Sequence, residues 1–201
     1  MVWPNIRRLK PGKMKPPLKA PKIFSPFFFV VLFVLANLYY CLGCDNKQGG
    51  KIGDNAPDIS ANDIHGKYFS LSKLKGKVVV IYFWTNSCCG TNLKQLEPLY
   101  RQYKNNGLEI LAINELDSKN VVESFARNNA LTFTMLTDEK SMLFKHYEAF
   151  GFPTILILDG RGVIRNKILG DMQVENLQKL VVRQFNIQKE IDANYQKNHP
   201  S

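Results

Sequence analysis

Residues 77–103 read KVVVIYFWTNSCCGTNLKQLEPLYRQY, and this stretch decides the fold. Val78 to Trp84 is an unbroken run of β-branched and aromatic residues, which predicts a strand buried on both faces. The strand should end at Thr85, where turn and cap residues begin. From Leu93 to Tyr103 apolar residues recur at helical spacing and predict a helix. The two adjacent cysteines of the stretch therefore lie where a buried strand leads into a helix N-terminus.

Cys88 and Cys89 are the candidate reactive groups of the chain. Unpaired N–H groups and the helix dipole favour an anion at a helix N-terminus, so a cysteine there can have a lowered pKa and react as a thiolate at neutral pH. The alternative interpretation is that both are small apolar residues packed in a core, the usual position of a free cysteine.

The net charge of +10 is concentrated at one end of the chain. Residues 1–44 carry seven Lys or Arg and no acid, so the remainder has 27 − 7 = 20 basic and 17 acidic residues, about +3. We find no clustered basic face of the kind that nucleic acids require, so we expect no nucleic-acid partner. The sequence also has no metal-ligand cluster and no phosphate-binding loop, and we expect no metal and no cofactor.

The basic leader is followed by an apolar core from Phe27 to Ala36, the pattern of a secretory signal. Leu42 and Gly43 before Cys44 resemble a bacterial lipobox, which implies a lipidated Cys44 at the start of the mature protein. The alternative is an uncleaved anchor, since residues 23–42 are long enough to span a bilayer. Both interpretations place the domain outside the cytoplasm, at the periplasmic face of the inner membrane or the cell surface. The leader is long, so translation could start at Met1 or Met14.

These patterns divide the chain into a leader and signal segment at 1–44, a tether at 45–52, one domain at 53–188 and a polar tail at 189–201. The mature domain then keeps two cysteines, the adjacent pair, and has no structural disulfide framework. Two neighbouring thiols at a strand-to-helix junction in a secreted domain are better explained by redox chemistry than by stapling.

The rest of the domain alternates strands and helices. We expect a hairpin turn at 65–67, a helical turn at 70–74, strands at 108–113, 133–136, 155–158 and 163–169, and helices from Ser118 through Ala126, over 139–150 and from Val174 to about Ile187.

This order resembles the thioredoxin fold, an α/β fold with a central mixed sheet flanked by helices. In detail it is similar to the extracytoplasmic TlpA/ResA-like branch of the redoxin, or AhpC-TSA, superfamily. The resemblance covers about 53–185. It is carried by Gly53, Ala56, Pro57, Asp58, Leu71, Leu74, Gly76, Lys77, Phe83, Trp84, Leu96 to Tyr100 and Gly151 to Thr154.

The resemblance implies roles for several residues. Pro153 matches the cis-proline beside which substrates pair, with Trp84, Phe152 and Thr154 as substrate-binding neighbours. Cys88 matches the nucleophile. Asp117 falls near a position where some relatives carry an acid beside the active site.

The motif itself departs from the family pattern, in which a resolving cysteine lies three residues after the nucleophile. Counting forward from Gly76 and Lys77 puts Thr91 at the resolving position, whereas counting backward from Leu96, Glu97 and Pro98 puts Cys89 there. With either count the Cys-x-x-Cys dithiol is absent. Adjacent Cα atoms lie about 3.8 Å apart, below the usual ~4.4 to 6.8 Å of a disulfide. A Cys88–Cys89 bond would therefore be easily reduced, and could serve as a redox couple or sensor. Otherwise Cys88 works alone, with an external thiol resolving its mixed disulfides.

We therefore expect a membrane-tethered thiol-disulfide oxidoreductase. Its partners would be protein or small-molecule disulfides, an external thiol reductant and the membrane through the N-terminus. Thr85 and Cys88 also have the Thr-x-x-Cys spacing of a peroxiredoxin-like peroxidase, although Ile81 replaces that family's proline. A third possibility is a non-catalytic module that binds a metal or a partner through the cysteines.

Overall fold

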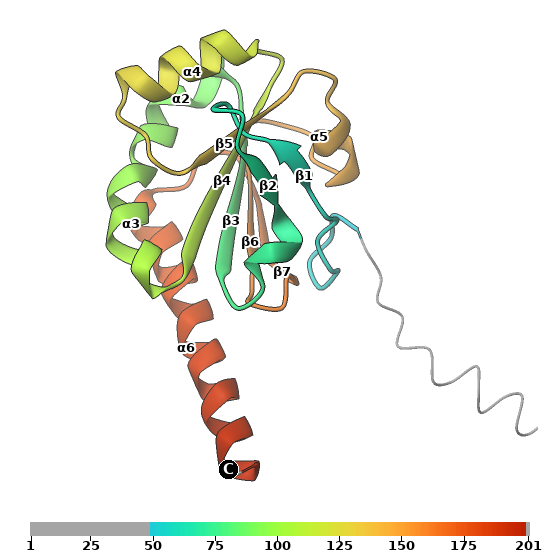
Figure 1. Ribbon diagram of the computed structural model, residues 1–201, viewed down its shortest axis with the longest axis vertical. Helices are drawn as coiled ribbons and strands as arrows, with labels where there is room; N and C mark the ends of the chain where they lie inside the picture. The colour runs from blue at the N-terminus through green and yellow to red at the C-terminus, as the bar shows by residue number, and fades with distance from the viewer. Residues whose placement is uncertain (1–48, 200–201) are drawn as a thin grey trace, which may run out of the picture. The chain divides into compact units, whose positions relative to one another are not determined.

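The computed structural model describes residues 49–199, which form an α/β domain around a five-stranded mixed sheet (Figure 1). The sheet order is β5-β4-β3-β6-β7. Its strands are β3 (Val78–Trp84), β4 (Leu108–Glu115), β5 (Thr134–Asp138), β6 (Thr154–Leu158) and β7 (Ile164–Leu169). β3 pairs parallel with β4 and antiparallel with β6, and this confirms the predicted thioredoxin-like fold.

The central strand is buried along its whole length, as its apolar run predicts. Val78, Val80, Tyr82 and Trp84 pack on one face of the sheet, and the residues between them pack on the other. The first face is covered by α2 (Asn86–Lys94), α3 (Leu96–Tyr103), α4 (Lys119–Asn128) and α6 (Val174–Asn198). The second face is covered by the 3-10 helix η1 (Leu71–Leu74) and by α5 (Met142–His146).

A small hairpin and an extended segment precede β3. β1 (Ser60–Asn62) pairs antiparallel with β2 (Tyr68–Ser70), so the hairpin turn predicted at 65–67 is confirmed. Before it, Gly53 donates to the carbonyl of Ile164, and Asn55 forms a bridge with Val163. The chain thus runs along the outer edge of β7.

The helix predicted from Leu93 to Tyr103 is two helices, α2 and α3, which meet at Gln95. Pro98 explains the break, because a proline lacks an N–H and its ring collides with the carbonyl four residues earlier, here Lys94. In the first turn of α3 the same proline is tolerated. After α3, a 3-10 turn, η2 (Lys104–Asn106), ends at Gly107 with φ 95°, as the predicted cap requires.

The helix predicted over 139–150 is reduced to the short α5. Asp138 at the end of β5 accepts the backbone N–H groups of Met142 and Phe144, both at 2.9 Å, and so delays the helix start. Ser141, just before the helix, has a left-handed φ of 52°. The helix predicted from Ser118 is confirmed as α4.

The last helix continues to Asn198, well past its predicted end near Ile187, and its second half projects beyond the sheet (Figure 1). The polar composition after Lys189 led us to expect a frayed tail, and that expectation is wrong up to Asn198. Local contacts support the extension, including Gln188 donating to Asp192 at 2.9 Å.

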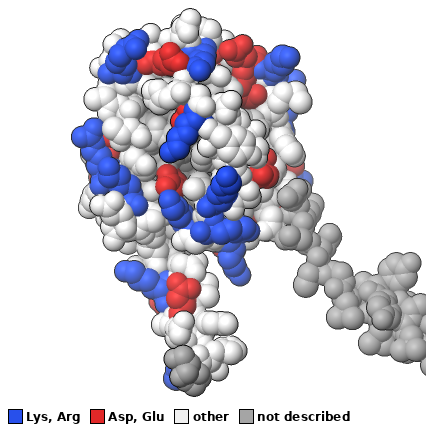
Figure 2. All heavy atoms as spheres, viewed as in Figure 1, with Lys and Arg blue, Asp and Glu red and all other residues white. Residues whose placement is uncertain are grey.

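Charges of both signs are spread over the face shown in Figure 2. Within 49–199, no helix combines the length and the apolar character needed to cross a bilayer. The predicted leader, the signal segment and the lipidation site Cys44 lie outside the described residues.

Candidate redox site

The reactive end of the domain begins where β3 gives way to α2. Thr85 keeps extended backbone angles of φ −128° and ψ 152°, which confirms the predicted strand end. Its carbonyl accepts the N–H of Cys89 at 3.2 Å, the first turn of the helix. Its hydroxyl donates to the Sγ of Cys88 at 3.4 Å. The backbone and the side chain of Thr85 thus both contact the cysteine pair.

Cys88 and Cys89 are joined by a disulfide, with their Cα atoms 3.8 Å apart. The sequence left open whether the two sulfurs are bonded, and the structure shows the bonded form. The two residues differ in exposure. Cys88 is exposed to solvent, whereas Cys89 is only 1% exposed and packs within the core beneath α2. An incoming group therefore meets the sulfur of Cys88 first.

A polar clamp holds the start of α2 against the end of β4. The Asp117 carboxylate accepts the backbone N–H of Asn86 and the side-chain amide of Asn114, both at 2.9 Å. The Asp117 N–H donates back to the Asn114 side-chain oxygen at 3.1 Å. The structure therefore brings Asp117 to the redox site, through a backbone contact two residues before Cys88.

Trp84 lies beneath the site rather than on its surface. Its ring is fully buried, 4.8 Å from the ring of Phe125 on α4, and its Nε1 has no hydrogen-bond partner among the described residues. A Cβ at Gly90 would lie 2.8 Å from the Phe125 ring, so the absence of a side chain at Gly90 leaves room for this ring against α2. Trp84 thus supports α2 from below, and a direct contact with substrate, as the resemblance implies, does not fit a buried ring.

The loop before β6 forms the other side of the site. The Phe152–Pro153 peptide bond is cis, as the resemblance implies. β6 pairs with β3 so that Thr154 lies opposite Phe83, which sets Pro153 beside the end of β3. Thr154 is buried, and its hydroxyl donates to the carbonyl of Gly151 at 2.7 Å. This side chain shapes the loop.

Phe152 links the loop to α5. It is half-buried, and its ring lies 4.9 Å from that of Phe144. Phe144 in turn makes an edge contact with Phe83 on β3, at 5.8 Å. The cis-proline loop therefore rests on α5 as well as on the central strand.

Glu115, the last residue of β4, is a feature that we did not predict. Its side chain is fully buried, and neither carboxylate oxygen makes a well-formed hydrogen bond within the described residues. Burial raises the pKa of Glu115 to about 8, with a lowering contribution from Ser141 and a raising one from Asp138. Asp138 lies opposite Glu115 in the pairing of β4 with β5. Near neutral pH the buried carboxyl is therefore mostly protonated.

Comparison with known proteins agrees with this geometry. A family model described as the AhpC/TSA family matches residues 52–167. The thiol-disulfide oxidoreductase ResA of Geobacillus kaustophilus is 31% identical over 155 residues, which cover 75% of this chain and 89% of the relative. ResA of Bacillus subtilis is 28% identical over 152 residues, with 75% and 85% covered.

Solved structures give the same result. StoA from Bacillus subtilis superposes with a TM-score of 0.55 and 28% identity, covering 63% of this chain and 97% of StoA. The thioredoxin domain of a thiol-disulfide oxidoreductase from Bacteroides vulgatus gives a TM-score of 0.57 and 26% identity, covering 65% and 98%. The chain therefore belongs to the AhpC/TSA family, as a thioredoxin-fold enzyme of the ResA-like thiol-disulfide oxidoreductase type, and the two cysteines of its described domain are adjacent.

Proposed function

We propose that the protein exchanges disulfides through Cys88, with Cys89 as the internal partner. The observation that carries the proposal is the unequal exposure of the two sulfurs: Cys88 faces solvent at the start of α2, and Cys89 is buried. Disulfide exchange requires in-line approach of a thiolate to one sulfur, so access decides which sulfur is attacked.

In the reductive half-reaction, the thiolate of an external thiol attacks the Sγ of Cys88. The Cys88–Cys89 bond breaks, a mixed disulfide forms on Cys88, and Cys89 leaves as a thiolate that takes up a proton. A second external thiolate then attacks the sulfur that came from the first external thiol, and Cys88 is released from the mixed disulfide as a thiolate. Two external thiols are oxidised to one disulfide, and the protein gains two electrons and two protons.

In the oxidative half-reaction, the Cys88 thiolate attacks a substrate disulfide and releases one substrate thiol. The Cys89 thiolate then attacks the Cys88 sulfur, which restores the Cys88–Cys89 bond and releases the second substrate thiol. The Thr85 hydroxyl, which donates to the Cys88 sulfur at 3.4 Å, supplies a hydrogen bond to the thiolate in this cycle.

We further propose that the domain acts outside the cytoplasm, tethered by the N-terminus. This rests on the basic leader, its apolar segment and the lipobox-like residues before Cys44. Cells expressing the full chain should carry it in the membrane fraction with a lipid mass added, and Cys44→Ser should lose that mass. Wild-type protein that stays in the membrane at full length with no added lipid mass would instead support the uncleaved anchor.

A thiol peroxidase is the second candidate, favoured by the same Thr85–Cys88 contact. Here the Cys88 thiolate attacks one oxygen of a peroxide and becomes a sulfenic acid, with water or an alcohol as the leaving product. The Cys89 thiolate then attacks the Cys88 sulfur and displaces hydroxide, which takes up a proton to become water, and the disulfide forms. This reaction ends in the same bonded pair as the exchange cycle, so the two activities are separated by substrate.

The test is a redox titration of the full-length protein in mild detergent. The protein is equilibrated with mixtures of reduced and oxidised glutathione, free thiols are alkylated, and the intact mass is measured. We expect loss of two hydrogens within one chain, at a defined midpoint. Glutathione bound to Cys88 at equilibrium would mean monothiol chemistry. If neither cysteine reacts until the protein unfolds, the proposal fails and a non-catalytic role remains.

A further inference from the structure

The side chain of Lys167, on β7, joins two segments that are far apart in the sequence. Its ammonium donates to the carbonyl of Gly50, where the described chain enters the domain, at 2.9 Å. It also donates to the carbonyls of Tyr147 and Glu148, just after α5, at 3.0 and 2.9 Å. An ammonium has three N–H donors, so these three acceptors use its whole hydrogen-bonding capacity. Lys167 therefore links one stretch of backbone to another.

The surroundings of the ammonium show that these contacts are built into the fold. Lys167 is partly buried, and burial lowers its pKa, with Glu148 raising it in part and Lys51 lowering it. The three carbonyls thus replace water that the ammonium gives up on burial. Glu148 has a left-handed φ of 50°, a conformation that costs a non-glycine residue energy. The hydrogen bond from Lys167 to its carbonyl helps to hold this strained turn in place.

The turn that Lys167 holds leads directly into the cis-proline loop, and the end of β7 contacts that loop again further along. A Cβ at Gly151 would lie 2.7 Å from the Cδ1 of Leu169, so the loop backbone packs closely on this side chain. The N–H of Gly170 donates to the carbonyl of Pro153 at 2.8 Å. The loop is thus fastened to β7 at its start by the Lys167 ammonium and at its end by the strand backbone.

The sheet register sets the end of this loop beside the cysteine pair. β6 pairs antiparallel with β3, and continuing their register puts Phe152 level with Thr85. Thr85 contacts both cysteines, through its carbonyl and through its hydroxyl. The ring of Phe152 also packs on α5, whose last carbonyls Lys167 binds. A shift of the loop at its Lys167 end would therefore alter the side of the site that faces Cys88.

We propose that Lys167 is a positioning residue for disulfide exchange, because its ammonium fixes the cis-proline loop against the entry segment at Gly50. This inference rests on the proposed exchange at Cys88 and adds a residue that acts through the loop. The rate of exchange in the folded protein should depend on Lys167. The equilibrium between the Cys88–Cys89 disulfide and the dithiol should not, because the ammonium binds backbone groups of the loop in both states.

The test measures single-turnover oxidation of the reduced full-length protein by oxidised glutathione in mild detergent. In each turnover one glutathione disulfide becomes two thiols, and the thiols of Cys88 and Cys89 become one disulfide. Lys167→Met keeps a long side chain and removes the ammonium. We expect the rate to fall about tenfold, since a misplacement of about 1 Å at a distance from the chemistry can cost up to about a hundredfold. The redox midpoint against glutathione should stay unchanged.

Gly50→Ala tests the same link from its other end. The added Cβ would collide with the carbonyl of Tyr147, so the entry segment must move away while Lys167 keeps its ammonium. The rate should fall as in Lys167→Met, and the double variant should lose little beyond the larger single loss, because both changes break one contact. Lys75→Met is the matched control, since this ammonium donates to the carbonyl of Arg161 at 2.9 Å at the opposite end of the sheet. Its rate should not change.

Each variant is assayed well below its own unfolding transition, so that a loss of folded protein is not counted as a loss of rate. A Lys167→Met protein that unfolds more easily but exchanges at the wild-type rate would overturn the positioning role. An equal loss of rate in Lys75→Met, or a shifted midpoint, would overturn it too, and disulfide exchange would stand. Should Lys167→Met not fold, Gly50→Ala decides by the same criteria. If glutathione does not oxidise the wild type, disulfide exchange itself fails and the positioning role fails with it.

Discussion

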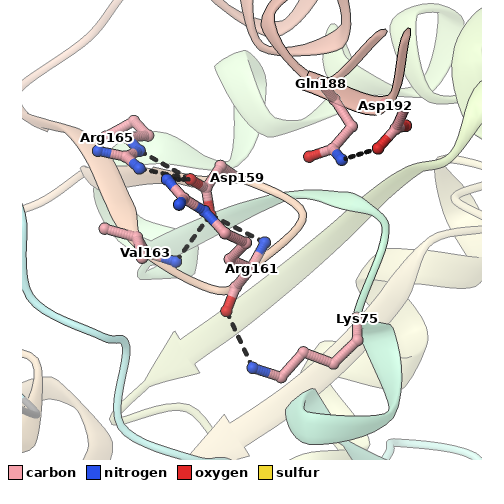
Figure 3. A network of polar contacts seen from close by, with 7 residues as sticks. All are labelled: Lys75, Asp159, Arg161, Val163, Arg165, Gln188 and Asp192. Carbon is pink, nitrogen blue, oxygen red and sulfur yellow. Dashed lines mark hydrogen bonds and ion pairs between the residues drawn. The ribbon is translucent and has the colours of Figure 1, made fainter. Parts of the chain in front are cut away.

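The two ends of the sheet are built differently. At the end opposite the cysteines, Asp159 in the β6–β7 turn is almost buried and fully paired (Figure 3). One of its oxygens accepts the N–H groups of Arg161 and Val163 at 2.9 and 3.0 Å, and the other accepts the Arg165 guanidinium at 2.8 Å. Burial alone would raise the pKa of Asp159, but these hydrogen bonds outweigh it and hold the pKa below its usual value.

The redox end differs in part. One of its buried carboxyls, Glu115, lacks well-formed hydrogen bonds, although the neighbouring Asp138 accepts two backbone N–H groups. Its left-handed positions include Leu116 and Ser141, whereas those at the Asp159 end are glycines such as Gly76 and Gly162 together with Ala130 before β5. The difference indicates that the Asp159 end stabilises the fold, whereas the redox end keeps strained and unpaired groups that serve chemistry and recognition.

The largest expected effect separates activity from stability. Cys88→Ser should lower the rate of disulfide exchange about a thousandfold or more, because the attacked sulfur is removed. Its free energy of unfolding, compared with that of the reduced wild type, should change by less than about 1 kcal/mol, since the side chain is exposed. Stopped-flow exchange assays and urea unfolding measure the two quantities. Retained activity would mean that Cys89 reacts directly.

At the Asp159 end of the sheet, we expect a substitution to lower stability and to leave activity unchanged. Asp159→Ala should lower the free energy of unfolding by about 2–3 kcal/mol, because it leaves two arginines and two N–H groups without their acceptor. The exchange rate of the folded protein should not change. The matched control is Asp192→Ala, an exposed acid on α6, which should cost about 0.5 kcal/mol or less. An equal loss of unfolding free energy in Asp159→Ala and Asp192→Ala would show that the Asp159 hydrogen bonds stabilise the fold no more than an exposed acid does.

Glu115 should make stability depend on pH. Its folded-state pKa of about 8 lies above the ordinary value of 4.5, so between these pH values the folded chain holds a proton that the unfolded chain releases. Stability should therefore fall as the pH rises from 4.5 to 8, by at most about 1.4 kcal/mol per pH unit, and level off above that range. Urea unfolding of the wild type and of Glu115→Gln at pH 5, 7 and 9 measures the effect.

Glu115→Gln should lack the fall in stability between pH 4.5 and 8 that Glu115 causes. Its stability relative to that of the wild type should therefore be higher at pH 9 than at pH 5. The control is Glu123→Gln, which changes a partly exposed acid 3.6 Å from Lys119. An unchanged slope in Glu115→Gln would mean that the buried carboxyl ionises at its ordinary pH.

The smallest effect is expected at the polar clamp. Asp117→Ala removes the acceptor of the Asn86 N–H and should cost about 1 kcal/mol of stability, the usual value of a helix N-terminal cap. The loss should be local, so hydrogen exchange at the start of α2 should rise while exchange in β4 stays slow. The exposed Glu139→Ala serves as control. Uniformly faster exchange would contradict a local role.

Much of the fold could be predicted because β3 and its turn residues carry strong local signals. The unbroken run from Val78 to Trp84 predicts a buried central strand, and the family resemblance carried by Gly151 to Thr154 implies the cis bond before Pro153. The break between α2 and α3 at Gln95 could also have been predicted, because Pro98 cannot accept a helical position with the carbonyl of Lys94 four residues earlier. We missed it because apolar spacing continues across the break.

Other features depend on tertiary contacts that a sequence does not display. In the sequence, Glu115 looks like any acidic residue at the solvent-exposed end of an apolar strand. Its burial beside Asp138 depends on the pairing of β4 with β5. The shortening of α5 depends on Asp138 binding two N–H groups ahead. The unequal burial of Cys88 and Cys89 follows from how α2 packs on the sheet. The sequence of two adjacent cysteines does not indicate which of them is buried.

In the proposed exchange, an incoming thiolate attacks the exposed Sγ of Cys88, and the buried Sγ of Cys89 leaves. The most direct measurement incubates Cys89→Ser and Cys88→Ser separately with one activated peptide disulfide and maps the adducts by mass spectrometry. The account predicts a stable mixed disulfide on Cys88 in Cys89→Ser, and little or none on Cys89 in folded Cys88→Ser. Rapid and equal labelling of both variants would contradict it, because Cys89 would then be as accessible as Cys88.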